Sequence, residues 1–128
     1  MREIRAFARR IAAEFKPRRI ILFGSHAYGT PSGDSDVDLM VVFQRTANNL
    51  QKAAQIRQRL DSPFSLDLLV RSEAEIRRRY RIEDWFIRDI VNKGMVLYEA
   101  DHTRVASRNR SRYSNGTTQT AMAGRKLR

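Results

Sequence analysis

Acidic side chains gather in one short stretch of this strongly basic chain. Residues 24–38 read GSHAYGTPSGDSDVD, and Asp36 and Asp38 stand two apart where an apolar run, 37–43, begins. Because side chains alternate along a strand, both carboxylates would point to one face, about 7 Å apart along the chain. Two carboxylates that close repel each other, but they suit a hard divalent cation such as Mg²⁺. The spacing therefore predicts a magnesium site, and Asp34, which lies earlier in the loop, is left out of it.

Gly24 ends another apolar run, 18–24, and Ser25 begins a short helical turn, 25–29. A glycine lets a phosphate approach the backbone, and unpaired N–H groups at the start of a helical turn attract anions. The Ser25 hydroxyl adds a further donor. Because Mg²⁺ is usually bound by one or two carboxylates together with substrate phosphates, the two halves of the stretch predict a bound nucleoside triphosphate. The role of Tyr28 stays open between packing and contact with the nucleotide.

Two commoner kinds of binding site are excluded because the sequence lacks residues that they require. Gly24 and Gly29 have the spacing of a phosphate-binding P-loop, but Thr30 stands where that motif needs lysine. The three aspartates match the first positions of an EF-hand calcium loop, but Leu39 replaces its glycine and Arg45 its final glutamate. A plain structural role, in which Asp36 and Asp38 cap a strand end or pair with Arg18 or Arg19, remains as the alternative.

The hydrophobic pattern predicts a small α/β (α+β) fold with a mixed β-sheet flanked by helices. Ser72 followed by Glu75 has the pattern of a capping box, which marks the start of a helix. Asp67 is a polar residue inside an otherwise apolar strand. The expected strands are 18–24, 37–43, 64–70 and 95–99, and the expected helices are 2–15, 47–60, 72–80 and 83–93.

Composition and charge divide the chain of 128 residues into one domain, 1–100, and a basic tail, 101–128. The tail carries seven Lys and Arg and one Asp, about half of the net charge of +11, and few apolar residues. We expect it to be disordered, with a nucleic-acid contact open only through this tail. No cysteine is present, no apolar run is long enough to span a membrane, and the N-terminus does not read as a signal peptide. We therefore expect a cytoplasmic protein.

The combined motif resembles the minimal nucleotidyltransferase domains of the DNA polymerase beta-type superfamily. Their pattern is Gly-Ser, about ten residues, then Asp-x-Asp, and here it is Gly24-Ser25, residues 26–35, then Asp36-Val37-Asp38. Asp67 fits the third carboxylate of the family, and the resemblance covers about residues 5–99. It implies the polymerase beta-type fold, ATP as substrate, and Mg²⁺ in two ions held by Asp36, Asp38 and Asp67. It also implies that Gly24 and Ser25 orient the phosphates.

The resemblance further implies an acceptor on a partner protein. Such minimal domains act as the antitoxin of a HEPN-domain ribonuclease toxin, to which they transfer AMP at a tyrosine. The apolar residues of 82–91 exceed what one buried stripe needs, which favours a partner surface about as well as core packing. Two alternatives stay open: a non-catalytic binding module that neutralises its partner by occlusion, and a subunit of a small-molecule nucleotidyltransferase.

Overall fold

A computed structural model describes residues 1–29, 31 and 35–100 of the chain. Asp34 and the predicted tail, 101–128, lie outside the described residues. The elements follow in the order α1 (Arg2–Phe15), β1 (Arg19–Phe23), α2 (Ser25–Tyr28), β2 (Val37–Phe43), α3 (Asn49–Arg59), β3 (Leu66–Ser72), α4 (Glu73–Arg81), α5 (Trp85–Lys93) and β4 (Met95–Glu99).

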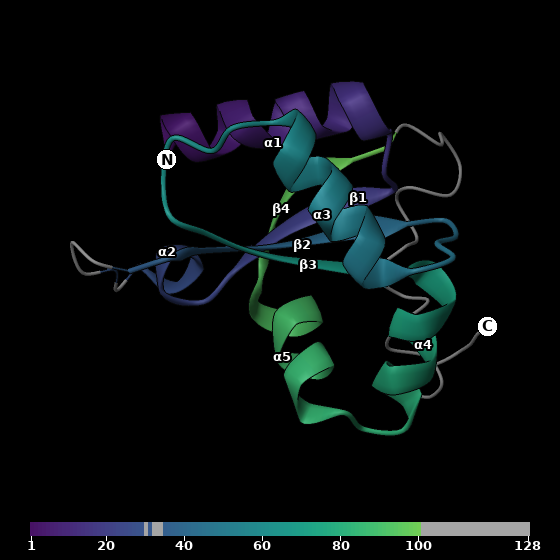
Figure 1. The fold of residues 1–128 in the computed structure, drawn as a ribbon. Coiled ribbons are helices and arrows are strands. Elements are labelled where there is room, and N and C mark those ends of the chain that lie inside the picture. Colours follow the sequence, from purple (N-terminus) through teal and green to yellow (C-terminus); the bar gives the residue numbers. More distant parts are fainter. Residues whose placement is uncertain (30, 32–34, 101–128) are drawn as a thin grey trace.

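The strands form a single four-stranded sheet in the order β3-β2-β1-β4 (Figure 1). β1 runs antiparallel to β2 and to β4, whereas β2 and β3 are parallel. Parallel neighbours need a long crossover, and α3 supplies it between β2 and β3. The predicted mixed sheet flanked by helices is therefore confirmed.

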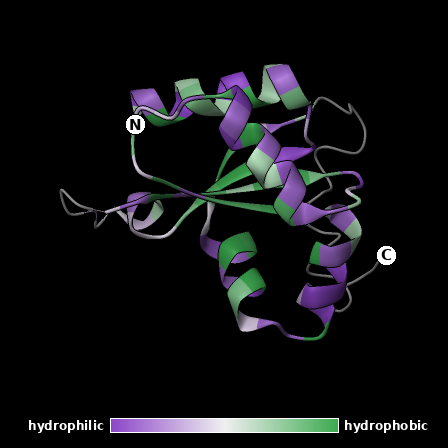
Figure 2. Cartoon of the chain, viewed as in Figure 1, coloured by the Kyte–Doolittle hydropathy of each residue, from purple (hydrophilic) through white to green (hydrophobic). Residues whose placement is uncertain are grey.

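Helices cover both faces of the sheet and make a three-layered molecule (Figure 1). α1 and α3 pack on one face, where Leu39 and Val41 of β2 meet a core that includes Phe7 and Ile56. α4 and α5 pack on the other face, where the core includes Met40. The central strands are accordingly hydrophobic along their length, whereas hydrophilic residues recur along α1, α3 and α4 (Figure 2).

Local capping explains where several elements begin. The Ser72 side chain accepts a hydrogen bond from the backbone N–H of Glu75, which confirms the predicted helix start. Asn48 and Asp84 cap α3 and α5 in the same way. These two helices therefore start two residues later than the hydrophobic pattern predicted.

The third strand is also displaced, to 66–72 from the predicted 64–70. Ser62 Oγ accepts a hydrogen bond from the Phe64 backbone N–H, which forms a local turn ahead of the strand. The Phe64 ring then packs edge-on against Phe7 of α1, with ring centroids 5.5 Å apart. Pairing with β2 begins only at Leu66, opposite Val37.

No helix in the described part of the chain is long and apolar enough to cross a membrane.

Candidate functional site

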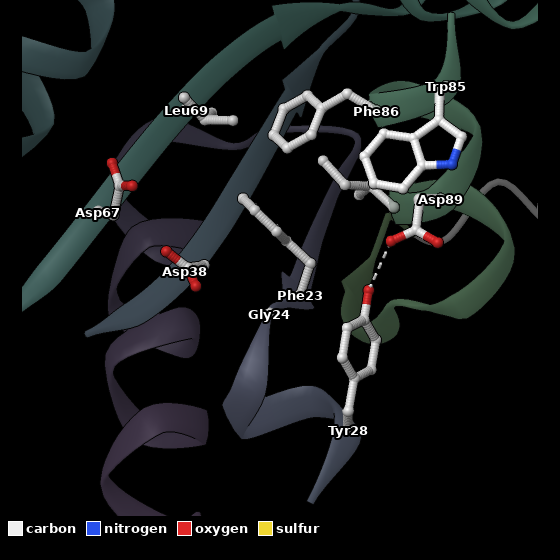
Figure 3. Close-up of a pocket in the computed structure, with 10 residues that line it drawn as sticks. Phe23, Gly24, Tyr28, Asp38, Asp67, Leu69, Trp85, Phe86 and Asp89 are labelled. Atoms are coloured by element: carbon white, nitrogen blue, oxygen red, sulfur yellow. Dashed lines mark hydrogen bonds between the residues drawn. The ribbon is translucent and has the colours of Figure 1, made fainter. Parts of the chain in front are cut away.

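Sheet register brings the predicted site residues to one edge of the sheet. Phe23, the last residue of β1, lies opposite Asp38 of β2. Asp38 lies in turn opposite Asp67 of the parallel neighbour β3. Gly24 directly follows Phe23, so three adjacent strands present a glycine and two carboxylates side by side (Figure 3).

Gly24 lets the Asp38 carboxylate lie against the backbone of the turn between β1 and α2. Its φ is 75° and its ψ is −161°, a conformation that is essentially reserved for glycine. A Cβ atom at this position would lie 2.1 Å from Asp38 Oδ2. The Gly24 carbonyl accepts hydrogen bonds from the N–H groups of Ala27 and Tyr28, which closes the turn. Ser25 is the first residue of α2 and is half-buried.

Asp36 lies one residue before β2 and is exposed. Ser65 Oγ donates a hydrogen bond of 2.5 Å to Asp36 Oδ1. The backbone N–H of Val37 donates to the Ser65 carbonyl at 2.8 Å, which ties the same two segments together. The Asp36 carboxylate is therefore oriented from the start of β3, although its charge still acts on Asp38.

The ionisation of Asp38 is perturbed by its surroundings. Burial, followed by the negative charges of Asp67 and Asp36, raises the pKa of Asp38, and a hydrogen bond with Asp67 acts in the same direction. The nearby His26 opposes the shift. His26 Nε2 also lies 3.2 Å from the Ser35 carbonyl oxygen, across the loop that leads into β2. Clustered acids with a raised pKa are typical of a functional site.

The carboxylates at this end of the sheet are suitable ligands for Mg²⁺. Among residues 1–29, 31 and 35–100, no three His, Cys, Asp or Glu side chains are grouped as a complete metal site. What the structure forms is a pair, Asp38 and Asp67, with Asp36 held by Ser65 beside it. Mg²⁺ is usually bound by one or two carboxylates plus substrate phosphates, so carboxylate oxygens in this number fit the ion.

The carboxylate pair opens into a cavity of about 380 Å³ that reaches α5. The α5 side of the cavity presents Trp85, Phe86 and Asp89 (Figure 3). Trp85 is 75% exposed and Phe86 is 44% exposed. The Tyr28 hydroxyl donates a 3.0 Å hydrogen bond to Asp89 Oδ2. Burial, then this hydrogen bond, raises the pKa of Tyr28, which keeps the phenol protonated as a donor.

Sequence reasoning missed Asp89, and it left Tyr28 undecided. The two residues are 61 positions apart, and neither belongs to a local motif. The apolar residues of 82–91 divide in the structure: Ile87 and Ile90 are buried, whereas Ile82, like Trp85 and Phe86, is exposed. The exposed part satisfies the expectation of surplus apolar surface, and only that part is open to a partner or ligand.

The alternative in which arginines neutralise Asp36 and Asp38 is wrong. Arg18 donates to the Gln44 side chain. Arg19 is buried and forms ion pairs with Glu73 and, at 3.2 Å, with Glu99. Both arginines stand at the start of β1, at the opposite end of that strand from the carboxylates.

Several solved structures match this chain, and those with a TM-score of 0.50 or more share its fold. A candidate nucleotidyltransferase from Sulfolobus solfataricus matches with a TM-score of 0.56 and 18% identity, over 79% of this chain and 81% of that one. A toxin–antitoxin structure with AMP-PNP matches with a TM-score of 0.50 and 23% identity, over 85% of this chain and 79% of that one. A mutant of the toxin–antitoxin MntA–HpeT reaches a TM-score of 0.46 and 21% identity, over 85% and 79%.

The comparison with curated proteins gave no match. The comparison with protein families gave one that spans most of the chain: the nucleotidyltransferase domain matches residues 4–102. This range contains every predicted site residue and all four strands. The chain therefore belongs to the nucleotidyltransferase domain family.

Proposed function

We propose that this chain transfers AMP from ATP to a tyrosine hydroxyl of a partner HEPN-domain ribonuclease toxin and so acts as its antitoxin. The observation that carries the transfer is the register that sets Asp38 opposite Asp67, with Gly24 against the Asp38 carboxylate. The family generally uses a nucleoside triphosphate and a divalent metal, which agrees with this donor set.

The carboxylates have separate roles in this proposal. Asp36 and Asp38 would hold Mg²⁺ on the triphosphate, and Asp67 would share a second ion near the acceptor hydroxyl. Mg²⁺, when bound, would neutralise the charge that develops on the transferred phosphoryl group. Ser65 keeps Asp36 oriented through its hydrogen bond to Oδ1.

The chain's own groups position the reactants. The backbone at Gly24 and the Ser25 hydroxyl orient the β- and γ-phosphates, which places the α-phosphorus beside the carboxylate pair. The acceptor oxygen attacks the α-phosphorus, the bond to the β-phosphate bridging oxygen breaks, and pyrophosphate leaves. The hydroxyl proton passes to the Asp67 carboxylate, which is exposed to the incoming acceptor.

The partner is proposed on two grounds. One of the solved structures that share this fold is described as a toxin–antitoxin with AMP-PNP, which supports a toxin partner and an adenine nucleotide. The sequence resemblance to minimal nucleotidyltransferase antitoxins supports the HEPN domain and the tyrosine acceptor.

Intact mass spectrometry tests the proposal directly. The purified chain is incubated with the product of its neighbouring gene, as the candidate HEPN-domain partner, together with Mg²⁺ and ATP, and the mass of both proteins is measured. We expect the partner to gain one or more AMP units. The matched control is Asp38→Asn, which keeps the side-chain size, removes the charge and should abolish the added mass.

Other outcomes would redirect the proposal. A stable complex without added mass, together with unchanged neutralisation of the toxin by Asp38→Asn, would favour the non-catalytic binding module. AMP transfer to a small molecule, with the partner unmodified, would favour the small-molecule nucleotidyltransferase. Near-normal transfer by Asp38→Asn would refute the carboxylate mechanism itself.

A further inference from the structure

We propose that the α5 side of the cavity binds the nucleoside part of the nucleotide. The base would stack on Trp85 and Phe86, and a ribose hydroxyl would donate to Asp89. This inference rests on the proposed function, because it assigns the remainder of a nucleotide whose phosphates lie at Gly24 and Asp38.

The carboxylates and the α5 side chains line one continuous cavity. A single cavity of about 380 Å³ contains Gly24 and the carboxylate pair and also reaches Trp85 and Phe86. Figure 3 shows the carboxylates of Asp38 and Asp67 on one side of this space and the α5 side chains on the other. A nucleotide whose α-phosphate lies at the carboxylates must extend its nucleoside away from them. The α5 side is the part of the same cavity that is open to receive it.

The aromatic side chains supply the second argument. Trp85 leaves three quarters of its surface in water at the first position of α5, and Asp84 fixes that helix start by capping it. Phe86 is held by an edge-on contact with Phe23, with ring centroids 5.9 Å apart. Exposed aromatic rings fixed on a helix make a stacking surface, and a nucleobase presents a flat face to it.

Charge supplies the third argument and sets the orientation. Asp89 accepts from the Tyr28 hydroxyl, and its other oxygen lies 3.4 Å from Lys93 Nζ. A carboxylate in this position disfavours phosphate and favours a hydroxyl donor, as acidic residues do with ribose in other nucleotide sites. The anionic end of the nucleotide therefore belongs with the metal-binding carboxylates, and the nucleoside belongs with α5.

The experiment uses the fact that Trp85 is the only tryptophan of the sequence. The full chain is titrated with Mg²⁺–ATP and, separately, with Mg²⁺–tripolyphosphate, which carries the same phosphates without a nucleoside. Calorimetry measures binding of each, and tryptophan fluorescence reports contact with the indole. We expect both ligands to bind, and only ATP to quench the fluorescence.

Variants complete the test. Trp85→Ala should weaken ATP binding by roughly 5- to 100-fold, the range expected for one lost stacking contact, and leave tripolyphosphate binding unchanged. Ile82→Ala is the matched control, because Ile82 is 65% exposed, lies three residues earlier and is not among the residues that line the cavity. It should leave both affinities unchanged.

The outcomes separate this inference from the proposed function. If ATP binds without quenching and Trp85→Ala binds it normally, the inference is overturned while nucleotide transfer stands. If only the partner protein quenches the fluorescence, and Trp85→Ala weakens only the partner, the α5 side is an acceptor surface and the inference is again overturned. If ATP does not bind at all, both fail together.

Discussion

Gly24→Ala is the sharpest perturbation that the site offers. The new Cβ would lie 2.1 Å from Asp38 Oδ2, where ordinary contacts begin at 3.4 Å. The carboxylate must therefore retreat by roughly 1 Å, and a misplacement of that size can lower a rate about 100-fold. The backbone conformation adds a strain of about 1–3 kcal/mol to the cost in folding stability.

Gly29→Ala is the matched control for that strain. Gly29 also has a positive φ, of 78°, at the end of α2, but a Cβ there meets nothing within 4 Å. We expect it to lower the free energy of unfolding by about 1–2 kcal/mol and to leave transfer close to normal. The difference between the two variants then isolates the contact with Asp38.

The assay combines thermal unfolding with AMP transfer, and a double-mutant cycle with Asp38→Ala closes the argument. In stability, Gly24→Ala should cost less in the Asp38→Ala background, because the atom that it strikes is gone. Equal stability costs in both backgrounds would show that the two residues do not interact. Wild-type transfer by Gly24→Ala would refute the claim that this glycine makes room for the carboxylate.

Two further predictions concern charge. Burial and the neighbouring aspartates raise the pKa of Asp38, so between its ordinary and raised values the folded chain binds more protons than the unfolded one. Stability of the metal-free protein should therefore rise as pH falls through that window, and Asp38→Asn should raise the melting temperature at neutral pH and flatten this slope. Glu73→Ala removes a buried partner of Arg19 and should lower the free energy of unfolding by up to about 3 kcal/mol, measured by denaturant titration, because Glu99 still pairs with Arg19. Glu14→Ala, which breaks an exposed pair with Arg59, should cost less than about 1 kcal/mol, and equal costs would contradict the assigned burial.

The sequence predicted correctly those parts of the fold and the site that a single short segment specifies. The apolar run 37–43 and the Gly-Ser pair that follows the preceding apolar run placed the strand and the glycine turn correctly, and Ser72 was correctly predicted as a cap. What it lacked was the relation between distant segments. The alignment of Asp38 with Asp67 depends on how α3 returns the chain, and the bond from Ser65 to Asp36 depends on that same register. A one-residue slip would put an apolar side chain opposite Asp38.

Charged side chains at the two ends of β1 lie in opposite electrostatic environments. At its start, the buried Arg19 is compensated by Glu73 and Glu99, as a folded chain requires of a charge removed from water. At its other end, Asp38 is partly buried beside two further carboxylates, and its burial, followed by their negative charges, raises its pKa. Packing does not require such a cluster, because a polar residue without charge would fill the same positions at lower cost. A cation delivered with a substrate would supply the missing compensation, so the repulsion at this edge supports the proposal that the site binds a metal-bound nucleotide.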